Sequence, residues 1–290
     1  MCDFIEQVFI SAQHNLESLY TDCIILTPPP EGSEVILLQD YLQPERLLSV
    51  IQATPEYEKT QDIRIAASIW NKVYSWATLP GVLALMTWAG VGLDASIDNV
   101  SLVLEDSQPK ALWFHDLSRS VIYPQRYLQS ASLKAIDIPA NYPGKIVNSV
   151  DDLHQFVFTG LFQRNLAPII DLVQRLTKLS KKTMWGNAVN ASEGQFFELS
   201  QCTTKEARQA DYSALYEQPE SLVLPGRNPL YNLVRTEQLN EPGLPNQVTV
   251  RLTCCLYAYI PPYDGKCSNC PLIETPERIA LMKADLAEDS

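Results

Sequence analysis

The stretch VTVRLTCCLYAYIPPYDGKCSNC, residues 248–270, contains four of the seven cysteines of this 290-residue chain. A strand-like run opens it, and two adjacent cysteines, an eleven-residue spacer and a Cys-x-x-Cys turn follow. Two thiolates that lie two residues apart can converge on one metal ion. The stretch therefore predicts a metal site whose candidate ligands are Cys254, Cys255, Cys267 and Cys270.

The adjacent pair sets a geometric condition, because consecutive side chains on an extended strand point to opposite faces. Cys254 and Cys255 can bind one centre only if the backbone bends there, and Pro261, Pro262 and Gly265 suit a spacer that folds back. Four thiolates fit a structural zinc ion as well as an iron–sulfur cluster. Zinc sites usually take both pairs from Cys-x-x-Cys knuckles or slightly longer ones, so the vicinal pair favours iron. Zinc and disulfides are left as alternatives.

The composition is that of an ordinary globular protein, with 46% hydrophobic and 19% charged residues. The formal net charge is −12, and no basic run is long enough to follow a phosphate backbone, which argues against nucleic acid as a partner. The most apolar stretch, residues 79–93, is interrupted by proline and glycine and is shorter than the roughly 20 residues that cross a membrane. The N-terminus has no secretory signal. We expect a cytoplasmic protein with no transmembrane segment, and peripheral association with the inner membrane is left open.

Helical spacing of apolar residues recurs along the chain. It predicts helices over residues 1–20 and 61–76, a helix that begins at Pro80, a long helix from residue 150 to 176 and another after residue 187. Ser149 is expected to cap the long helix and Pro168 to kink or divide it. Lys178, Lys181 and Lys182 are expected at its C-terminal end, where cations stabilise the helix dipole.

Strand signals are fewer. Runs at 100–104 and 111–115 predict an antiparallel hairpin with a six-residue polar loop, and 35–38 predicts a short strand in an irregular region over 27–57. The mixture predicts an α+β fold that is helix-rich, with a small antiparallel sheet and a C-terminal cysteine-rich iron–sulfur segment. We expect an N-terminal helix and irregular proline-rich segment over 1–60, a main α+β domain over 61–250 and a C-terminal metal-binding segment over 251–290.

The C-terminal motif resembles that of the FhuF-type ferric-siderophore reductases, whose signature is a vicinal Cys-Cys, a spacer and a Cys-x-x-Cys. The matching residues run from Arg251 to Tyr257 and from Lys266 to Leu272. Weaker matches precede them in the order of the family, at Trp70–Tyr74, Val100–Asp106, Asn165–Leu176 and Met184–Asn187. The spacer is one residue longer than is common in the family. Leu252 stands where the family often has a second arginine, which puts a basic pair beside the cluster in doubt.

The resemblance implies a [2Fe–2S] cluster on the four cysteines and one-electron reduction of siderophore-bound Fe(III) to Fe(II), with no catalytic residue beyond the cluster. It implies two partners, a ferric siderophore and an electron donor such as a ferredoxin, flavodoxin or flavin reductase. Trp185, Asn187 and Arg251 are candidate substrate-binding residues, with a core position for Trp185 and a solvated strand position for Arg251 as the plain alternatives. The net charge of −12 favours a neutral or cationic hydroxamate chelate over an anionic catecholate.

Two functions of other classes are left open. The metal site could hold together an interaction module, or a module related to siderophore synthetases, without redox activity. Gly90-Val-Gly92 lacks the third glycine and the preceding strand of a dinucleotide-binding loop, which argues against direct NAD(P)H binding. The remaining cysteines, Cys2, Cys23 and Cys202, are scattered and are interpreted as small apolar side chains.

Overall fold

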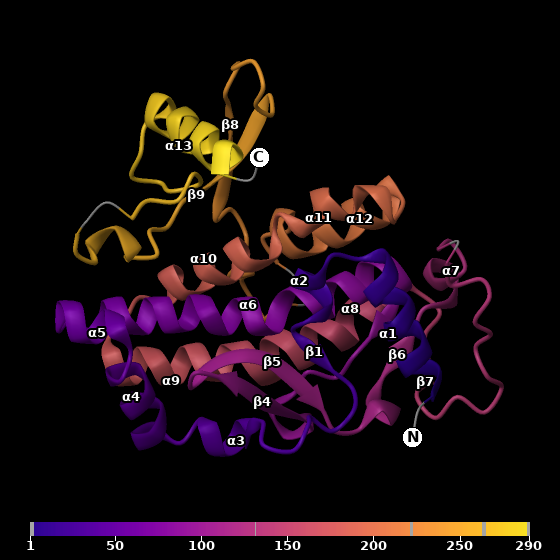
Figure 1. Cartoon of the computed structure of the whole chain (residues 1–290). Helices are drawn as coiled ribbons and strands as arrows, with labels where there is room; N and C mark the ends of the chain where they lie inside the picture. Colours follow the sequence, from indigo (N-terminus) through magenta and orange to yellow (C-terminus); the bar gives the residue numbers. More distant parts are fainter. Residues whose placement is uncertain (1–2, 131, 221–222, 263–264, 289–290) are drawn as a thin grey trace.

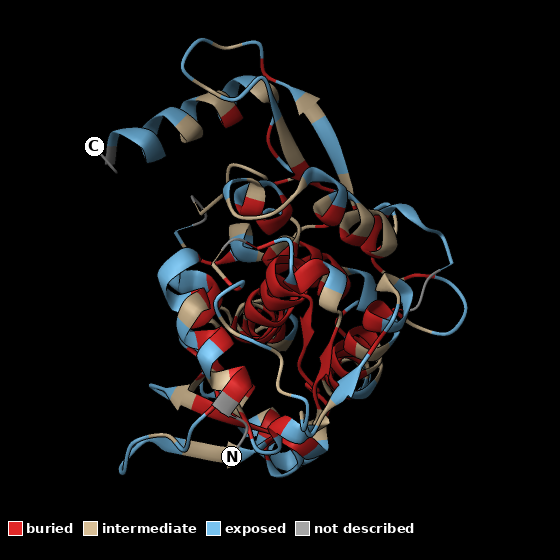
Figure 2. Cartoon of the chain, turned by 90° about the vertical axis from the view of Figure 1, so that its right-hand side faces the viewer, coloured by how far each residue is buried: buried red, intermediate tan, exposed pale blue. Residues whose placement is uncertain are grey.

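A computed structural model describes residues 3–130, 132–220, 223–262 and 265–288. Helix α6, Ile63–Ala89, runs through the middle of the molecule and is buried over most of its length (Figure 1, Figure 2). It begins after Asp62, whose carboxylate accepts a hydrogen bond from the Arg64 amide at 2.9 Å, and it ends at Gly90, whose φ of 64° forms a left-handed cap. Because α6 is apolar on nearly every side, other elements pack around it.

Pro80 lies inside α6, so the prediction of a separate helix that begins there is wrong. A proline inside a helix removes one backbone hydrogen bond and costs roughly 3 kcal/mol. The neighbouring side chains of Leu79, Val82 and Leu83 are at most 1% exposed and belong to the main core. Burying each such side chain contributes about 1.5–3 kcal/mol, so packing on both sides of Pro80 keeps the helix continuous.

The main sheet has four strands in the order β1-β5-β4-β2. They are β1 Ile24–Ile25, β2 Glu34–Leu37, β4 Val100–Glu105 and β5 Gln108–Phe114. β4 and β5 form the predicted hairpin, but its loop is the two residues Asp106 and Ser107 and not six residues. Their φ angles of 50° and 63° suit a type I′ turn, the connection that matches the twist of paired strands. β1 pairs in parallel with β5, so this sheet is mixed and not purely antiparallel.

The N-terminal region is more regular than the sequence predicts. The helix expected over 1–20 is present as α1 Asp3–Asn15 and α2 Ser18–Thr21, and residues 38–60 form α3 Leu38–Tyr41, α4 Pro44–Gln52 and α5 Pro55–Thr60. Pro44 and Pro55 stand in first turns, where a missing N–H breaks no helical hydrogen bond. Thr54 Oγ1 accepts a hydrogen bond from the Tyr57 amide at 3.3 Å. The prolines that suggest irregular structure therefore begin helices.

The long helix predicted from residue 150 consists of three consecutive segments. They are α8 Val150–Phe158, a π-helical segment at Thr159–Leu166 and α9 Ala167–Thr177. Ser149 caps α8 as predicted, because its Oγ accepts a hydrogen bond from the Asp152 amide at 3.1 Å. Pro168 stands in the first turn of α9, directly after the π-helical segment. Lys181 and Lys182 begin α10, Lys181–Ser192, and do not end the preceding helix as predicted.

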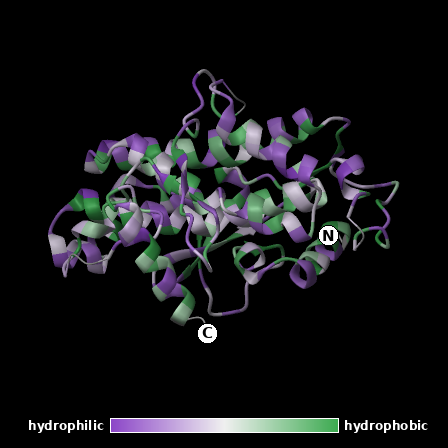
Figure 3. Cartoon of the chain, turned by 90° about the horizontal axis from the view of Figure 1, so that it is seen from above, coloured by the Kyte–Doolittle hydropathy of each residue, from purple (hydrophilic) through white to green (hydrophobic). Residues whose placement is uncertain are grey.

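The last third of the chain forms helices against α6 and then a C-terminal extension. The elements are α11 Gln195–Glu198, α12 Lys205–Tyr212, a π-helical segment at Ser213–Glu217, the hairpin of β8 Val234–Gln238 and β9 Gln247–Arg251, and α13 Thr275–Glu288. Figure 1 shows the hairpin and α13 beyond α10, α11 and α12, on the side away from the main sheet. In Figure 3, hydrophilic and hydrophobic residues alternate along the outer helices, as expected for helices with one face on the core.

Short elements complete the connections between α6 and α8. They are β3 Val91–Gly92, β6 Val121–Ile122 and β7 Lys145–Ile146, which form a second sheet, two 3₁₀ turns at Ile97–Asn99 and Leu117–Arg119, and α7 Pro124–Tyr127. A buried ion pair ties α12 to this region, because Arg126 donates to the Asp211 carboxylate at 2.7 Å. Thr87 and His154 also bond to Asp211, at 2.7 and 2.6 Å. One residue thus holds α12 against α6, α7 and α8.

The described part of the chain is therefore α+β and helix-rich, as predicted. Apolar side chains from residue 4 to residue 233 join one hydrophobic core, which includes side chains from the N-terminal helices. The division at residues 60 and 250 stays a prediction. Among the residues that the structure describes, no helix is long and apolar enough to cross a membrane.

Candidate functional site

The backbone turns sharply just after the adjacent cysteines, at Leu256, while the binding of one centre by both cysteines stays a prediction. β9 ends at Arg251, and Leu256 adopts a left-handed conformation with a φ of 67°. Such a conformation is uncommon for a non-glycine residue and marks a sharp local turn. The turn directs the Leu256 amide at Cys254 Sγ, to which it donates at 3.2 Å. Backbone N–H groups that donate to cysteine sulfur are one of the means by which proteins tune iron–sulfur clusters.

The Cys267–Cys270 turn is held by a buried arginine that the sequence analysis did not identify. The Cys270 amide donates to the Cys267 carbonyl at 2.9 Å and closes the turn. Arg278 of α13 has no exposed surface and donates to the carbonyls of Ser268, Cys270 and Ile273, the last two at 3.2 and 3.1 Å. Arg278 lies eight residues after Cys270, and no sequence pattern connects it to the motif. Its role in holding the turn is therefore visible only in the folded chain.

Arg251 lies beside the cysteines and lacks partners for part of its guanidinium group. Its side chain is 1% exposed, and its Nη2 atom lies 3.5 Å from Cys255 Sγ. Its Nε and Nη1 atoms are buried without a hydrogen-bond partner in the described structure. Leaving such donors unpaired is costly, so the site suits an additional acceptor or anion. Arg251 is thus not the solvated strand residue that was the alternative interpretation.

The electrostatics of the cysteines follow from these contacts. The Cys267 thiol donates to Cys255, and with the nearby Arg251 guanidinium it holds the pKa of Cys255 far below its usual value. The pKa of Cys267 is raised because that hydrogen bond and burial keep its proton in place. Burial raises the pKa of Cys254, which also lies near Cys255 and Cys270. At least one sulfur of the motif is therefore stabilised as a thiolate, the form that binds metals.

The residues around the four cysteines suit an anionic, sulfur-rich centre, although the described side chains are not arranged as a complete metal site. Six cysteines are described, and all six are free, which removes disulfides among them; Cys2 lies outside the described residues. Within the same described ranges, no three or more His, Cys, Asp or Glu side chains are arranged to hold a metal ion. The unpaired Arg251 donors and the Leu256 amide favour an acceptor at this place. The choice between a [2Fe–2S] cluster and zinc stays a prediction.

Trp185, Gly186 and Asn187 join the cysteine segment to the helical core. Trp185 is 5% exposed and packs on Phe162, with ring centroids 6.5 Å apart. Asn187 is 1% exposed and donates to the Ser68 carbonyl at 2.9 Å, while Ser68 Oγ donates to the Cys255 carbonyl at 2.7 Å. Neither side chain lines a described cavity. The contacts show a packing role for Trp185 and a positioning role for Asn187, and substrate binding by either stays a prediction.

Gly186 of α10 packs closely against Thr253, the residue that precedes Cys254. A Cβ atom at Gly186 would lie 1.8 Å from Thr253 Oγ1, whereas one at Gly194 would meet nothing closer than 3.7 Å. We expect Gly186→Ala to lower the free energy of unfolding by about 1–3 kcal/mol through overpacking. Gly194→Ala, at a helical φ of −60°, is the matched control and should be neutral or slightly stabilising. Thermal unfolding of both variants is the measurement, and equal stabilities would contradict the close packing at Gly186.

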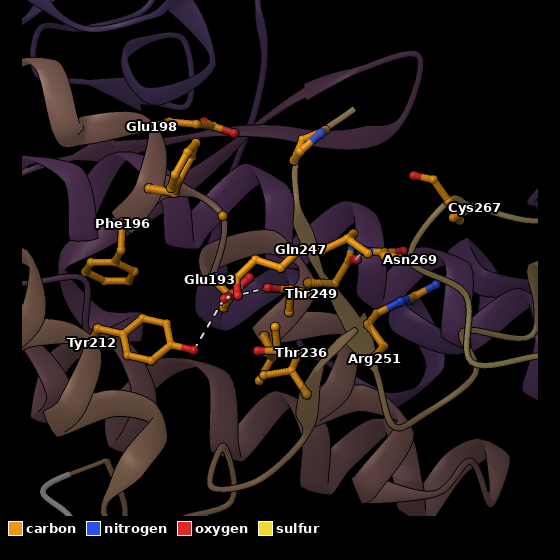
Figure 4. Close-up of a pocket in the computed structure, with 18 of the residues that line it drawn as sticks. Glu193, Phe196, Glu198, Tyr212, Thr236, Gln247, Thr249, Arg251, Cys267 and Asn269 are labelled. Carbon is orange, nitrogen blue, oxygen red and sulfur yellow. Dashed lines mark hydrogen bonds between the residues drawn. The ribbon is translucent and has the colours of Figure 1, made fainter. Parts of the chain in front are cut away.

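A groove of about 910 Å³ runs beside the cysteines, between α10–α12 and the β8–β9 hairpin. Four residues of β9 line it, namely Gln247, Val248, Thr249 and Arg251. Figure 4 shows Phe196 and Tyr212 on one side of Glu193, and Cys267 and Asn269 on the other. The groove therefore leads from an aromatic end to the cysteine site. The sequence analysis did not identify it, because its walls come from elements far apart in the chain.

Glu193 is a half-buried carboxyl group within this groove. Its Oε1 atom accepts hydrogen bonds from Thr249 at 3.2 Å and from Tyr212 at 3.4 Å (Figure 4). In the described residues no cation forms an ion pair with it. Burial raises its pKa above the usual value of 4.5, and the two hydrogen bonds offset only part of that effect. Its ionised form is thus disfavoured in the folded protein.

The raised pKa of Glu193 predicts a pH-dependent stability change. Because the folded-state pKa lies above the unfolded value, ionisation penalises the fold only above that unfolded value, 4.5. We expect Glu193→Gln, which keeps an acceptor for Thr249, to raise the melting temperature near neutral pH and to change it little at pH 4. Glu31→Gln, at an exposed loop position, is the control and should show no such trend. A Glu193→Gln effect that does not grow with pH would contradict the assignment.

Comparisons with known proteins bear on this geometry. No curated protein sequence matches the chain. Among solved structures, aerobactin synthetase IucC from Klebsiella pneumoniae matches with a TM-score of 0.52 and 17% identity, over 71% of this chain and 37% of that one. Petrobactin biosynthesis protein AsbB from Bacillus anthracis matches with a TM-score of 0.57 and 13% identity, over 79% and 45%. At these identities the likeness shows the fold alone, and the chain spans less than half the length of either synthetase.

The family comparison covers more than half of the chain. The family described as ferric iron reductase FhuF-like transporter matches residues 68–243. That range contains most of α6, all of α10–α12 and β8, and it ends before the cysteines. The four-cysteine site thus lies outside the matched residues, while the helices that face it lie inside. On this match, the chain belongs to the FhuF-like ferric iron reductase family.

Proposed function

We propose that this protein is a ferric-siderophore reductase, which transfers one electron to siderophore-bound Fe(III) from a [2Fe–2S] cluster on Cys254, Cys255, Cys267 and Cys270. The observation that supports it best is the buried Arg251, whose unpaired donors lie beside Cys255 and at the end of a chelate-sized groove. Family membership adds a role in iron reduction. The proposal accounts for the thiol site, the groove and the arginine together.

The chemistry rests on the difference between the two oxidation states of iron. A siderophore holds Fe(III) with hard oxygen donors, and Fe(II), with its lower charge, binds the same donors more weakly, so reduction releases the metal. The cluster would supply the electron. The chain's own residues would set the conditions: Arg251 and the Leu256 amide place positive charge and an N–H donor at the sulfurs. Both favour the more negative, reduced state and so raise the reduction potential.

The proposal needs an electron donor, such as a ferredoxin, a flavodoxin or a flavin reductase. Tyr257 and Tyr259, which follow the adjacent cysteines, are 42% and 51% exposed. They would offer an aromatic contact surface close to Cys255. The free thiols suit the reducing cytoplasm, where we place the reaction. Neither the donor surface nor the cytoplasmic location depends on association with the inner membrane.

Anaerobic purification followed by a visible spectrum tests the proposal. A red-brown protein with equal amounts of iron and acid-labile sulfide is expected. After reduction with dithionite and removal of the excess, a ferric hydroxamate chelate should reoxidise the protein and yield Fe(II), which a ferrous-specific chelator would report. A colourless protein that contains zinc would overturn the redox function. A coloured protein that the chelate cannot reoxidise would also overturn it.

A second function is favoured by the fold likeness to siderophore synthetases. The chain would then bind a siderophore or its precursor in the groove without redox chemistry, and the metal site would only fasten the C-terminal segment. The chain spans 37% of IucC and 45% of AsbB, so a complete synthetase reaction is not what we propose. Chelate binding without any reoxidation of the reduced protein would favour this alternative.

A further inference from the structure

Basic side chains outnumber acidic ones in the lining of the groove, in a chain whose net charge is −12. The lining contains four basic and two acidic side chains, a formal charge of 4 − 2 = +2 without the proposed cluster: Lys72, Lys205, Arg208, Arg251, Glu193 and Glu198. The cluster would add negative charge at the Arg251 end, so the positive charge that matters for a ligand is that of Lys205 and Arg208 at the other end. Electrostatic interactions fall off over about 10 Å at ordinary salt. A ligand in the groove therefore responds to these six groups more strongly than to the acidic exterior.

The basic side chains of the groove have no carboxylate partners among the described residues. Lys72 lies over the Tyr257 ring at 5.9 Å. Arg208 donates to the Phe196 carbonyl at 2.8 Å, and its Nε atom is buried without a partner. Arg251, 1% exposed, lies beside Cys255, where the proposed cluster would take up its charge. The positive charge of Lys205 and Arg208 is thus the part that is available to a ligand.

The two acidic side chains of the groove form no ion pair with these cations among the described residues. Glu193 accepts hydrogen bonds from Thr249 and Tyr212, as described above. Glu198 accepts a hydrogen bond from the Tyr20 hydroxyl. Lys205 and Arg208 therefore have no carboxylate partner within the groove.

We propose that the groove selects ferric chelates that carry a free carboxylate, so that the complex is anionic. The carboxylate binds at the Lys205–Arg208 end, near the aromatic side chains, and the ferric centre lies toward Arg251 and Cys267. This inference rests on the proposed function and specifies its substrate class. It reverses the preference for neutral or cationic chelates that the net charge of the whole chain favours, because local charges decide binding in a groove.

A matched series of redox-inert chelates tests the charge preference. The Ga(III) complexes of desferrioxamine B, its N-acetyl derivative and its N-succinyl derivative share one metal-binding unit and are cationic, neutral and anionic. Their affinities for the purified full chain are measured by quenching of tryptophan fluorescence, since Trp76 lines the groove, and by calorimetry. The anionic complex should bind about tenfold more tightly than the cationic one, the effect of one charged hydrogen bond of ordinary strength. Added salt should reduce that ratio.

Substitutions of Lys205 and Arg208 test whether the preference for the anionic complex arises at their end of the groove. Arg208→Gln and Lys205→Gln should each lower the ratio of affinities for the anionic and cationic complexes, and Arg208→Lys should restore much of it. Lys205 is exposed and unpaired in the described structure, so its replacement tests the idea even if an Arg208 variant folds poorly. Arg175→Gln, an exposed change on α9 outside the groove, is the control and should leave the ratio unchanged.

The outcomes separate the two proposals. Equal affinities across the series, or tighter binding of the cationic complex, would overturn the carboxylate preference and leave the reductase function standing. Failure of all three complexes to bind would overturn a siderophore site in this groove and with it the proposed function. Gallium cannot accept the electron, so neither result depends on the cluster being active.

Discussion

Replacing Cys255 with serine is expected to abolish the visible absorption, the iron content and the ferric-chelate reduction of the anaerobically purified protein. Cys255 is contacted by several of the residues that hold the cysteine site in place. Ser68 holds its carbonyl at 2.7 Å, Arg251 lies 3.5 Å from its sulfur, and its pKa is far below that of an ordinary thiol. Serine keeps the shape of the side chain but not the thiolate that binds the metal. Reduction should therefore fall to the background of the buffer.

Cys202→Ser is the matched control for that experiment. Cys202 is partly exposed, lies far from the motif in sequence and donates weakly to the Asn15 carbonyl at 3.6 Å. Burial raises its pKa, so it has no thiolate character to lose. Its variant should keep the colour, the iron and the rate of the parent protein. A Cys255→Ser protein that retains full iron content and reduction would refute the ligand assignment. Parallel loss in the control would point to general instability.

Local signals in the sequence predicted the elements that depend on neighbouring residues. The Ser149 cap and the pairing of β4 with β5 each follow from the chemistry of a few consecutive side chains. The errors occurred where tertiary packing outweighs local preference. Pro80 stays inside α6 because the side chains around it are buried, and Pro44 and Pro55 begin helices in a region that composition alone marks as irregular.

The groove and its charges could not be predicted for a different reason. Lys72 lies more than a hundred residues before Arg208, Arg208 lies about forty before Arg251, and no periodic pattern connects the three. Their proximity exists only after α6, α12 and β9 have packed. The sequence thus identified the candidate metal ligands, whose spacing is local, but not the groove in which we propose that a chelate binds. Its net charge favoured a neutral or cationic chelate, whereas the basic side chains of the groove lead us to propose an anionic one.

Arg278→Met is expected to cause the largest loss of stability among changes outside the cysteines. Arg278 has no exposed surface, and its Nε atom donates to the Glu237 carboxylate of β8 at 3.2 Å. Together with a hydrogen bond from Thr275, this contact lowers the pKa of Glu237. Methionine fills a similar volume but leaves the carboxylate and the carbonyls of the Cys267–Cys270 turn without their donor. Glu237 is partly exposed, so the expected loss is that of leaving hydrogen-bonded groups without their donor, about 1–3 kcal/mol.

Lys283→Met separates this anchoring from a general effect of removing charge from α13. Lys283 lies on the same helix and pairs with Glu241, but its side chain is 52% exposed, and an exposed pair contributes less than about 1 kcal/mol. Thermal unfolding measures the stability of both variants, and the fading of visible absorption in the presence of an iron chelator measures retention of the cluster. Arg278→Met should unfold at lower temperature and lose its colour faster, because the turn that carries two of the proposed ligands is no longer fixed.

If Arg278→Met loses stability while its colour fades at the parental rate, Arg278 supports the fold and not the metal site. If the two variants behave alike, the buried anchor has no special role.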